Sequence, residues 1–130
     1  MAEARRTVNA PDAPEAIGPY SHAVKAGGLL FCSGQIPLDP QSGELTGDTA
    51  AEQAPQCLRN LTAVCSAAGT SLDRAVRLTI YTTELQDFAA INEAYAAFFE
   101  ADPPARAVVG VASLPMGALV EIDAVVALED

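Results

Sequence analysis

The protein has few of the side chains on which most metal and nucleophile chemistry depends. Its 130 residues include one histidine, His22, and three cysteines, Cys32, Cys57 and Cys65. One histidine cannot supply a multi-histidine metal site and leaves little for a histidine-paired nucleophile, so no metal is expected. Because the cysteines are odd in number and lack C-x-x-C spacing, neither a disulfide framework nor a zinc site is indicated. We interpret His22 as a structural residue of a strand, and Cys57 and Cys65 as small buried hydrophobes of a helix.

Positive charge is also scarce. Lysine and arginine number 7 against 17 aspartates and glutamates, for a net charge of −10. The cations are scattered along the chain, at Arg5, Arg6, Lys25, Arg59, Arg74, Arg77 and Arg106. Nucleic acid or an anionic membrane needs a concentrated basic patch, so neither is expected as a partner. No apolar run approaches the ~18 residues of a membrane span, and no apolar segment follows the first arginines, so we expect a cytoplasmic protein.

Common catalytic motifs are missing as well. The chain has no P-loop, no H-E-x-x-H and no G-x-S-x-G elbow. Gly27, Gly28 and Gly34 do not form a G-x-G-x-x-G fingerprint that opens a helix. Chemistry in this chain is therefore left to arginine, glutamate, tyrosine, hydroxyl groups, backbone groups and water.

The length and composition of the chain fit one domain over residues 1–130, because half of the residues are hydrophobic and can form a packed core. Residues 1–15 are polar and broken by proline, so we expect an irregular lead-in. A strand of about six residues is predicted before a tight turn at Gly27–Gly28, and residues 29–35 return beside it. Within that returning strand, Gly34 marks either a β-bulge or a place where the backbone approaches a ligand. Further strands are predicted over residues 76–81, 106–112 and 119–128.

Two helices are predicted between these strands. Thr49 and Glu52 form a capping box that opens the first helix, and Gly69 is its stop. Pro55 lies beyond the first turn, so this helix either starts late or kinks there. Asp87 is expected to cap the second helix, which ends before the next pair of prolines. Its stripe of buried residues is Phe88, Ile91, Tyr95 and Phe98.

The predicted order is strand, strand, helix, strand, helix, strand, strand. One sheet with both helices on one face is the economical packing of this order, which predicts an α+β fold. No helix covers the other face of the sheet, and that face is too apolar to be exposed to solvent over its whole area. We therefore expect further copies of the chain to close around it.

The C-terminal part carries the residues that point most directly to a ligand. Arg106 opens an apolar run that ends at Ala112, so its charge lies where the core begins. In the last strand, alternation puts Glu121 and Asp123 on the face opposite the most apolar one. We expect the last two strands to form a hairpin with Glu121 beside Arg106. The guanidinium then binds either a ligand carboxylate or Glu121 itself, in a structural ion pair.

Four separated motifs of the chain are Ile17-Gly18-Pro19-Tyr20, Ser33-Gly34-Gln35-Ile36-Pro37, Asn92 with Tyr95, and Pro104-Ala105-Arg106 followed by Val120-Glu121-Ile122. Together they resemble the signature set of the Rid family, the reactive intermediate deaminases, also called the YjgF family. The likeness runs from residue 8 to the end, in the right order and spacing. It implies a chorismate-mutase-like α+β fold and a homotrimer with its sheets around a central barrel, with active sites between subunits. It also implies hydrolysis of 2-imino acids or their enamine tautomers, such as 2-iminobutanoate and 2-iminopropanoate, to 2-keto acids and ammonia, without a cofactor.

The resemblance also implies roles for individual residues. Arg106 holds the substrate carboxylate, which suits the planar fork of a guanidinium. Glu121 holds the attacking water and accepts its proton. The remaining site residues are Tyr20, which is catalytic, and Ser33, Gly34, Asn92 and the backbone of Val108, which bind the substrate.

The chain departs from the family pattern at two places. Val108 stands where some members carry a cysteine, so no thiol chemistry is expected. Pro103 replaces the aromatic residue that often precedes Pro-Ala-Arg, and this alters the side-chain preference more than the reaction. Two alternative functions stay open: a non-catalytic trimer that binds small carboxylates as a sensor or chaperone, and a ribonuclease or translation inhibitor. The net charge and the single histidine disfavour the last of these.

Overall fold

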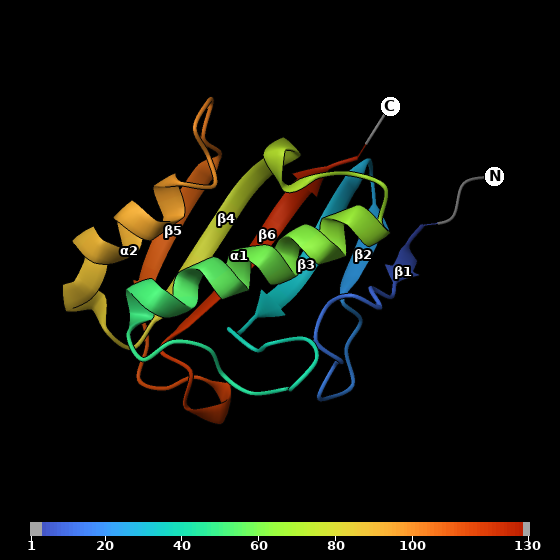
Figure 1. Ribbon diagram of the computed structural model, residues 1–130. Helices are drawn as coiled ribbons and strands as arrows, with labels where there is room; N and C mark the ends of the chain where they lie inside the picture. Colours follow the sequence, from blue (N-terminus) through green and yellow to red (C-terminus); the bar gives the residue numbers. More distant parts are fainter. Residues whose placement is uncertain (1–3, 129–130) are drawn as a thin grey trace.

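The computed structural model describes residues 4–128. A six-stranded sheet forms one layer, and two α-helices cover one of its faces (Figure 1). The strand order is β1-β2-β3-β6-β4-β5; β4 and β5 run parallel, and the other neighbouring strands pair antiparallel. The predicted α+β class with both helices on one face of one sheet is confirmed.

The elements follow the predicted order, with one strand added at the start. The strands are β1 (Arg6–Val8), β2 (Ala23–Ala26), β3 (Leu29–Gln35), β4 (Ala75–Thr82), β5 (Ala105–Gly110) and β6 (Val120–Ala127). The α-helices are α1 (Ala50–Ala67) and α2 (Phe88–Ala96), and the 3-10 turns are η1 (Leu72–Arg74), η2 (Leu85–Asp87) and η3 (Pro115–Gly117). Because β1 pairs with β2, the prediction that residues 1–15 are irregular was wrong at residues 6–8. Residues 1–3 lie outside the described part of the chain.

The predicted hairpin of the last two strands was wrong. β5 pairs in parallel with β4, and β6 pairs antiparallel with both β3 and β4, so β4 lies between β5 and β6. The physical reason is the helix α2, which crosses from β4 to β5 and makes those two strands parallel neighbours. The nine residues 111–119 then carry the chain back past β4 into the middle of the sheet.

The first helix begins and ends where the sequence predicts. The amide of Glu52 donates to Thr49 Oγ1 at 3.2 Å, and the Glu52 carboxylate accepts from the amide of Asp48 at 2.8 Å. At the other end, the amides of Gly69 and Thr70 donate to the carbonyls of residues 66 and 65, the pattern of a Schellman cap. Pro55 lies inside the helix, so the alternative of a late start was wrong.

The second helix differs from its prediction at both ends. Asp87 stands at the N-cap position but makes no side-chain cap, because η2 runs directly into the helix. Ile91 and Tyr95 are buried as predicted, whereas Phe88 is 43% exposed and Phe98 lies beyond the last helical residue. Phe88 therefore does not belong to the buried stripe of α2.

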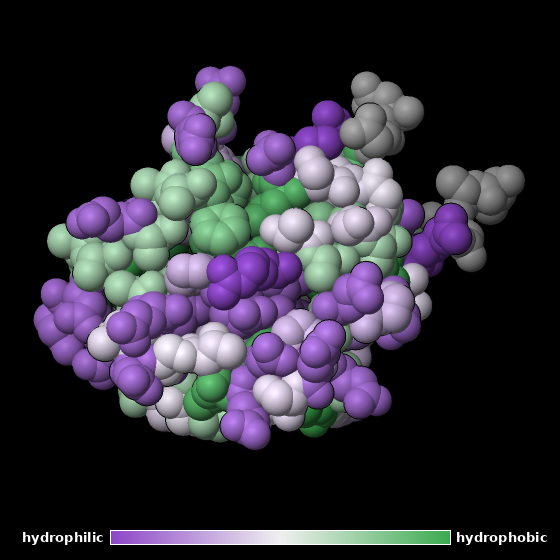
Figure 2. Space-filling view, in the orientation of Figure 1, coloured by the Kyte–Doolittle hydropathy of each residue, from purple (hydrophilic) through white to green (hydrophobic). Residues whose placement is uncertain are grey.

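The core lies between the helices and the sheet. α1 contributes Leu58, Leu61 and Val64, which join Leu30, Leu78, Ile80 and Ile122 of the strands in one fully buried cluster. Burying one such side chain stabilises the fold by about 1.5–3 kcal/mol. Hydrophilic residues cover the exposed side of α1, as expected for a helix with one buried face (Figure 2). Within residues 4–128, no helix has both the length and the hydropathy needed to cross a membrane.

Candidate active site

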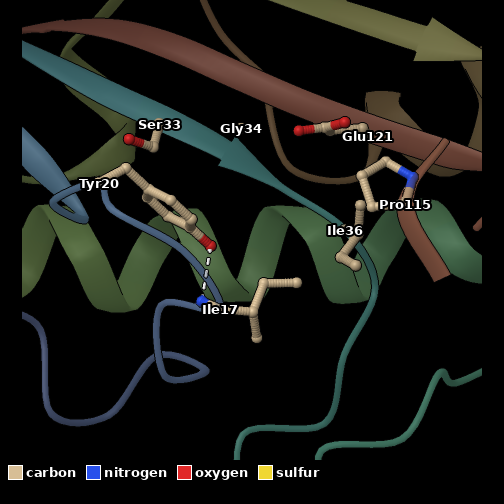
Figure 3. A pocket seen from close by; sticks show the side chains of 7 residues that line it. All are labelled: Ile17, Tyr20, Ser33, Gly34, Ile36, Pro115 and Glu121. Carbon is tan, nitrogen blue, oxygen red and sulfur yellow. Dashed lines mark hydrogen bonds between the residues drawn. The ribbon is translucent and has the colours of Figure 1, made fainter.

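A cavity of about 200 Å³ lies where β3 ends and β6 begins (Figure 3). Its lining, which we call the Glu121 cavity, consists of Ile17, Tyr20, Ser33, Gly34, Ile36, Pro115 and Glu121. Four of these were predicted from the sequence as site residues: Tyr20, Ser33, Gly34 and Glu121. The volume is below the range of about 300–1,000 Å³ of drug-sized ligand sites, so the cavity suits a ligand of few atoms.

Two buried amides of α1 hold the walls of this cavity in place. Asn60 donates to the carbonyls of Ile36 and Leu38, at 3.3 and 3.0 Å, and so fixes the chain that leaves β3. Gln53 accepts from the amide of Leu119 at 2.8 Å and fixes the chain that enters β6. Sequence reasoning missed both residues. Their signal was a polar side chain on the buried stripe of an amphipathic helix, where an amide needs a partner.

The two hydroxyl groups of the cavity have different hydrogen-bonding capacity left for a ligand. Ser33 Oγ donates to the carbonyl of Ser21 at 2.6 Å, so its proton is engaged and its lone pairs remain. Tyr20 accepts from the amide of Ile17 at 3.4 Å, so its own proton remains available (Figure 3). The cavity therefore offers one acceptor and one donor.

Glu121 and Gly34 are in close contact across the cavity. The carboxylate of Glu121 points at the backbone of Gly34, where a Cβ atom would lie 2.9 Å from Glu121 Cδ (Figure 3). The register of β3 against β6 also shifts between Cys32 and Gln35, which marks a bulge. The register shift supports the bulge interpretation of Gly34, and the bulge brings its backbone to the Glu121 carboxylate. Approach of that backbone to a ligand stays a prediction.

The environment of Glu121 favours its protonated form. Burial raises the pKa of the Glu121 carboxyl group above its usual range, and the negative charge of Asp123 raises that pKa further. Asp123 lies on the same face of β6 and accepts a hydrogen bond from Tyr81 at 3.1 Å. A carboxyl group with a raised pKa accepts a proton more readily than an ordinary carboxylate and can return it later in a reaction. Sequence reasoning identified Glu121 but missed the influence of Asp123.

The predicted Arg106 site lies elsewhere, on the helix-covered side of the sheet. Arg106 pairs with the buried Leu78 of β4, and its guanidinium carbon lies 4.9 Å from the ring centroid of Tyr95 and 5.8 Å from that of Phe88. Both distances are in the cation–π range. These contacts hold the guanidinium beside two aromatic rings, and its N–H groups can donate to a planar anion.

Two further polar groups accompany Arg106. Asn92 Oδ1 and the hydroxyl of Tyr95 are buried without a hydrogen-bond partner in the described chain. Asn92 stands four residues after Phe88 and three before Tyr95, so these side chains share one face of α2. We call Arg106, Phe88, Asn92 and Tyr95 the Arg106 cluster. Buried polar groups without partners are uncommon in native proteins, so the two need a structural or functional explanation.

The predicted proximity of Arg106 and Glu121 within one chain was wrong. Glu121 pairs with Tyr81, which lies on the open face of β4, whereas Arg106 pairs with Leu78, which lies on the helix-covered face. The two residues are thus separated by a whole strand and by the thickness of the sheet. A structural ion pair between them inside one chain is excluded by this arrangement.

Val108 shares the orientation of Arg106. It pairs with the buried Ile80 and packs against the core, and β5 forms the outer edge of the sheet. An edge strand has backbone groups that no neighbouring strand pairs, so a carbonyl of β5 can accept a hydrogen bond from a ligand. Within residues 4–128, no group of three or more histidine, cysteine, aspartate or glutamate side chains is arranged to hold a metal ion.

Known proteins resemble this chain over nearly its whole length. Residues 10–128 match the model of the protein family described as endoribonuclease L-PSP. The RutC family protein y4sK of Sinorhizobium fredii is 53% identical over 121 residues, which are 93% of this chain and 96% of that protein. The human protein named 2-iminobutanoate/2-iminopropanoate deaminase is 42% identical over 121 residues, which are 93% of this chain and 88% of that protein.

Solved structures show the same fold. TdcF of E. coli, solved with bound serine, has a TM-score of 0.89 and 40% sequence identity, and the match covers 95% of this chain and 99% of that one. The region that matches the family model contains the whole Glu121 cavity and the whole Arg106 cluster. From these matches we conclude that the chain belongs to the Rid (YjgF) family, the reactive intermediate deaminases.

Proposed function

We propose that this protein hydrolyses small 2-imino acids, or their enamine tautomers, to 2-keto acids and ammonia. The observation that carries the proposal is the Glu121 cavity, in which a half-buried carboxyl group of raised pKa lies beside two hydroxyl groups. The name of the human relative supports the substrate class. The serine bound to TdcF supports it too, because serine carries a carboxylate and a nitrogen on the same carbon atom, as a 2-imino acid does.

We further propose a homotrimer with its sheets around a central barrel, in which Arg106 of one subunit faces the Glu121 cavity of the next. Support comes from the separation of Arg106 and Glu121 on opposite faces of one sheet, since neither half-site can complete the other within a chain. The open face of the sheet also carries large apolar side chains, with Phe31 46% exposed and Val109 40% exposed. Apolar side chains of this size on a sheet face favour a contact with another subunit.

In the proposed complex, Arg106 binds the substrate carboxylate through two parallel hydrogen bonds. Asn92 and the backbone carbonyl of Val108 then make polar contacts with the remainder of the bound acid. Ser33, whose proton is engaged by Ser21, accepts a hydrogen bond from the imine nitrogen. The hydroxyl group of Tyr20 donates a hydrogen bond to the hydroxyl group that forms from the attacking water.

The proposed reaction needs only water and one group that moves protons. Glu121 takes a proton from water as the new C–O bond forms, and passes it to the imine nitrogen, which gives an amino alcohol. It then takes the proton of the new hydroxyl group while the C–N bond breaks, and passes that proton to the departing nitrogen. One water is consumed, and the keto acid and ammonia are released. Anchoring of the carboxylate makes these steps effectively unimolecular.

A coupled assay tests the proposed function. An amino acid oxidase or a threonine dehydratase generates the imine in place, and semicarbazide competes for it as a trap. We expect the protein to suppress semicarbazone formation and to speed the release of keto acid. Absence of any effect with several imino acids, while keto acids still bind, would instead support the alternative of a non-catalytic carboxylate-binding protein.

Gly34→Ala is expected to lower kcat by about 10²-fold, because a methyl group at this position displaces the Glu121 carboxylate by the order of an ångström. The backbone of Gly34 is not in the left-handed region, so the fold should tolerate alanine. Gly18→Ala is the matched control, since its Cβ would meet the ring of Tyr20 at an ordinary 3.7 Å. Steady-state kinetics of both variants provide the measurement. Equal rates for Gly34→Ala and the wild type would show that the exact location of the Glu121 carboxylate does not affect the rate.

Asp123→Asn is expected to move the acid limb of the kcat/KM profile to lower pH. Asp123 raises the pKa of Glu121, so removing its charge lowers that pKa and keeps Glu121 ionised in more acidic solution. The asparagine retains an oxygen that can accept from Tyr81. Rates measured from pH 4 to 9 on the variant and on a surface control, Asp73→Asn, provide the comparison. An unchanged acid limb in Asp123→Asn would show that another group sets it.

The description of the family model as an endoribonuclease does not alter the proposal. Seven cations against seventeen acidic residues make this chain repel a polyanion at physiological salt. A filter-binding measurement at low salt checks this directly. Tight RNA association at low salt would favour the ribonuclease function over imine hydrolysis.

A further inference from the structure

His22 stands directly before β2, and its side chain is only 5% exposed. Its Nδ1 accepts the backbone N–H of Ala10 at 2.9 Å, and its Nε2 lies 2.8 Å from the carbonyl oxygen of Pro14. An amide N–H can only donate and a carbonyl can only accept. The imidazole is therefore neutral, with its hydrogen on Nε2, and both of its nitrogens are engaged by the backbone.

The two backbone partners of His22 belong to the segment that leads into the Glu121 cavity. Residues 10–20 contain no helix and no strand, and they end with Ile17 and Tyr20, which line that cavity. Ala10 is fully buried and forms a turn in which the amide of Ala13 donates to its carbonyl at 3.1 Å. The segment is therefore held at its start by the core and by His22, while Tyr20 lies near its far end.

Packing alone does not hold the far end of this segment. A second cavity of about 180 Å³ lies between the segment and β1, and its lining includes Ala16, Tyr20, Ser21 and His22. Tyr20 thus has open space on one side and the Glu121 cavity on the other. With space on both sides and 44% of its surface exposed, the Tyr20 ring is not enclosed by packed neighbours.

The backbone of His22 connects the same segment to the other hydroxyl group of the cavity. The amide of Ser33 donates to the carbonyl of His22 at 3.0 Å, and Ser33 Oγ donates to the carbonyl of Ser21. His22 is thus attached at three points, to residues 10 and 14 through its ring and to residue 33 through its backbone. It sets the position of Tyr20 relative to Ser33.

We propose that His22 is a positioning residue, whose neutral imidazole clamps residues 10–20 so that Tyr20 and Ile17 stay on the wall of the Glu121 cavity. This inference rests on the proposed imine hydrolysis, since the clamp acts on that reaction through Tyr20. His22 itself touches no substrate. Its contribution is the fixed distance between the donor of Tyr20 and the acceptor of Ser33.

The test compares His22→Gln with His22→Leu. A glutamine amide has one acceptor and one donor at nearly the spacing of the two imidazole nitrogens, so it can bridge Ala10 and Pro14 in the same way. Leucine fills similar space and can make neither hydrogen bond. We expect His22→Gln to retain the wild-type kcat and His22→Leu to lose about 10²-fold in kcat with a smaller change in KM, because the carboxylate anchor is untouched.

Amide hydrogen exchange of residues 9–20 gives a second readout that does not depend on turnover. We expect faster exchange at Ala10 in His22→Leu and wild-type exchange in His22→Gln, since only the latter restores the acceptor. Unchanged exchange in His22→Leu would overturn the clamp. Restored exchange with kcat still reduced in His22→Gln would overturn the positioning role. A wild-type protein without turnover would overturn the proposed function, while the exchange data would still decide on the clamp.

Discussion

Arg106→Ala is expected to abolish measurable turnover and to leave the assembly intact. Two charge-assisted hydrogen bonds to the substrate carboxylate are lost, each worth roughly 1.5–3 kcal/mol, so kcat/KM should fall by about 10²–10⁴-fold. Arg106→Lys should also be poor, because an ammonium group cannot form the two parallel bonds of the guanidinium fork or stack in the same way on Tyr95 and Phe88. The imine assay with the semicarbazide trap measures both variants.

The matched control for this prediction is Arg59→Ala. Arg59 is exposed on α1, where it donates to Gln56, and it belongs to neither the Glu121 cavity nor the Arg106 cluster. Its removal changes the net charge by the same amount, so it should leave the rate unchanged. Sedimentation of all three variants reports the assembly. Near wild-type turnover in Arg106→Ala would reject the hypothesis that Arg106 anchors the substrate carboxylate. A monomeric wild-type protein would count against a site shared between subunits.

Both helices and every strand except β1 were predictable, because each depends on local pattern. β3 covers the predicted residues 29–35, and β6 alternates as predicted, with Val120, Ile122, Ala124 and Val126 buried. The neighbour of each strand was not predictable in the same way. Nothing between Gly110 and Val120 distinguishes a return beside β5 from a return beyond β4, because that choice is made by sheet pairing over long range.

Because the hairpin prediction was wrong, the predicted proximity of Arg106 and Glu121 was wrong as well. Side-chain alternation placed Glu121 correctly on the open face of β6, but the assumed pairing placed Arg106 next to it. In the structure β4 separates the two, so under the proposed function one chain holds two incomplete half-sites. The family resemblance had implied sites between subunits, and this separation gives that implication a physical reason, although the assembly itself remains a proposal.

The residues that sequence reasoning missed act by positioning others. Asn60 and Gln53 hold the walls of the Glu121 cavity, and Asp123 raises the pKa of Glu121. None of them belongs to a recognisable motif, because each acts through a contact that only the folded chain creates. Ile17 and Ile36 do stand in motifs of the family resemblance, but like Pro115 they were not identified as pocket residues.

Glu121→Gln is expected to lower kcat by about 10²–10⁴-fold, the range of general acid–base catalysis, with little change in KM. The amide is nearly isosteric with the carboxylate but can neither accept a proton from water nor return one. KM should change little because the substrate carboxylate is held by Arg106. The same substitution should raise the melting temperature at neutral pH. A carboxyl group whose pKa is raised in the folded state resists ionisation there, and a neutral side chain removes that cost.

A double variant separates the steric and chemical contributions at this position. If Gly34→Ala acts by displacing the Glu121 carboxylate, it should cost nothing further in kcat once Glu121 is already glutamine. Losses that multiply in Gly34→Ala/Glu121→Gln would show that Gly34 contributes independently, through contact of its backbone with the substrate. A Glu121→Gln protein with unreduced kcat would reject Glu121 as the group that moves protons. If instead that protein lost both turnover and assembly, Glu121 would be a structural residue of the subunit contact.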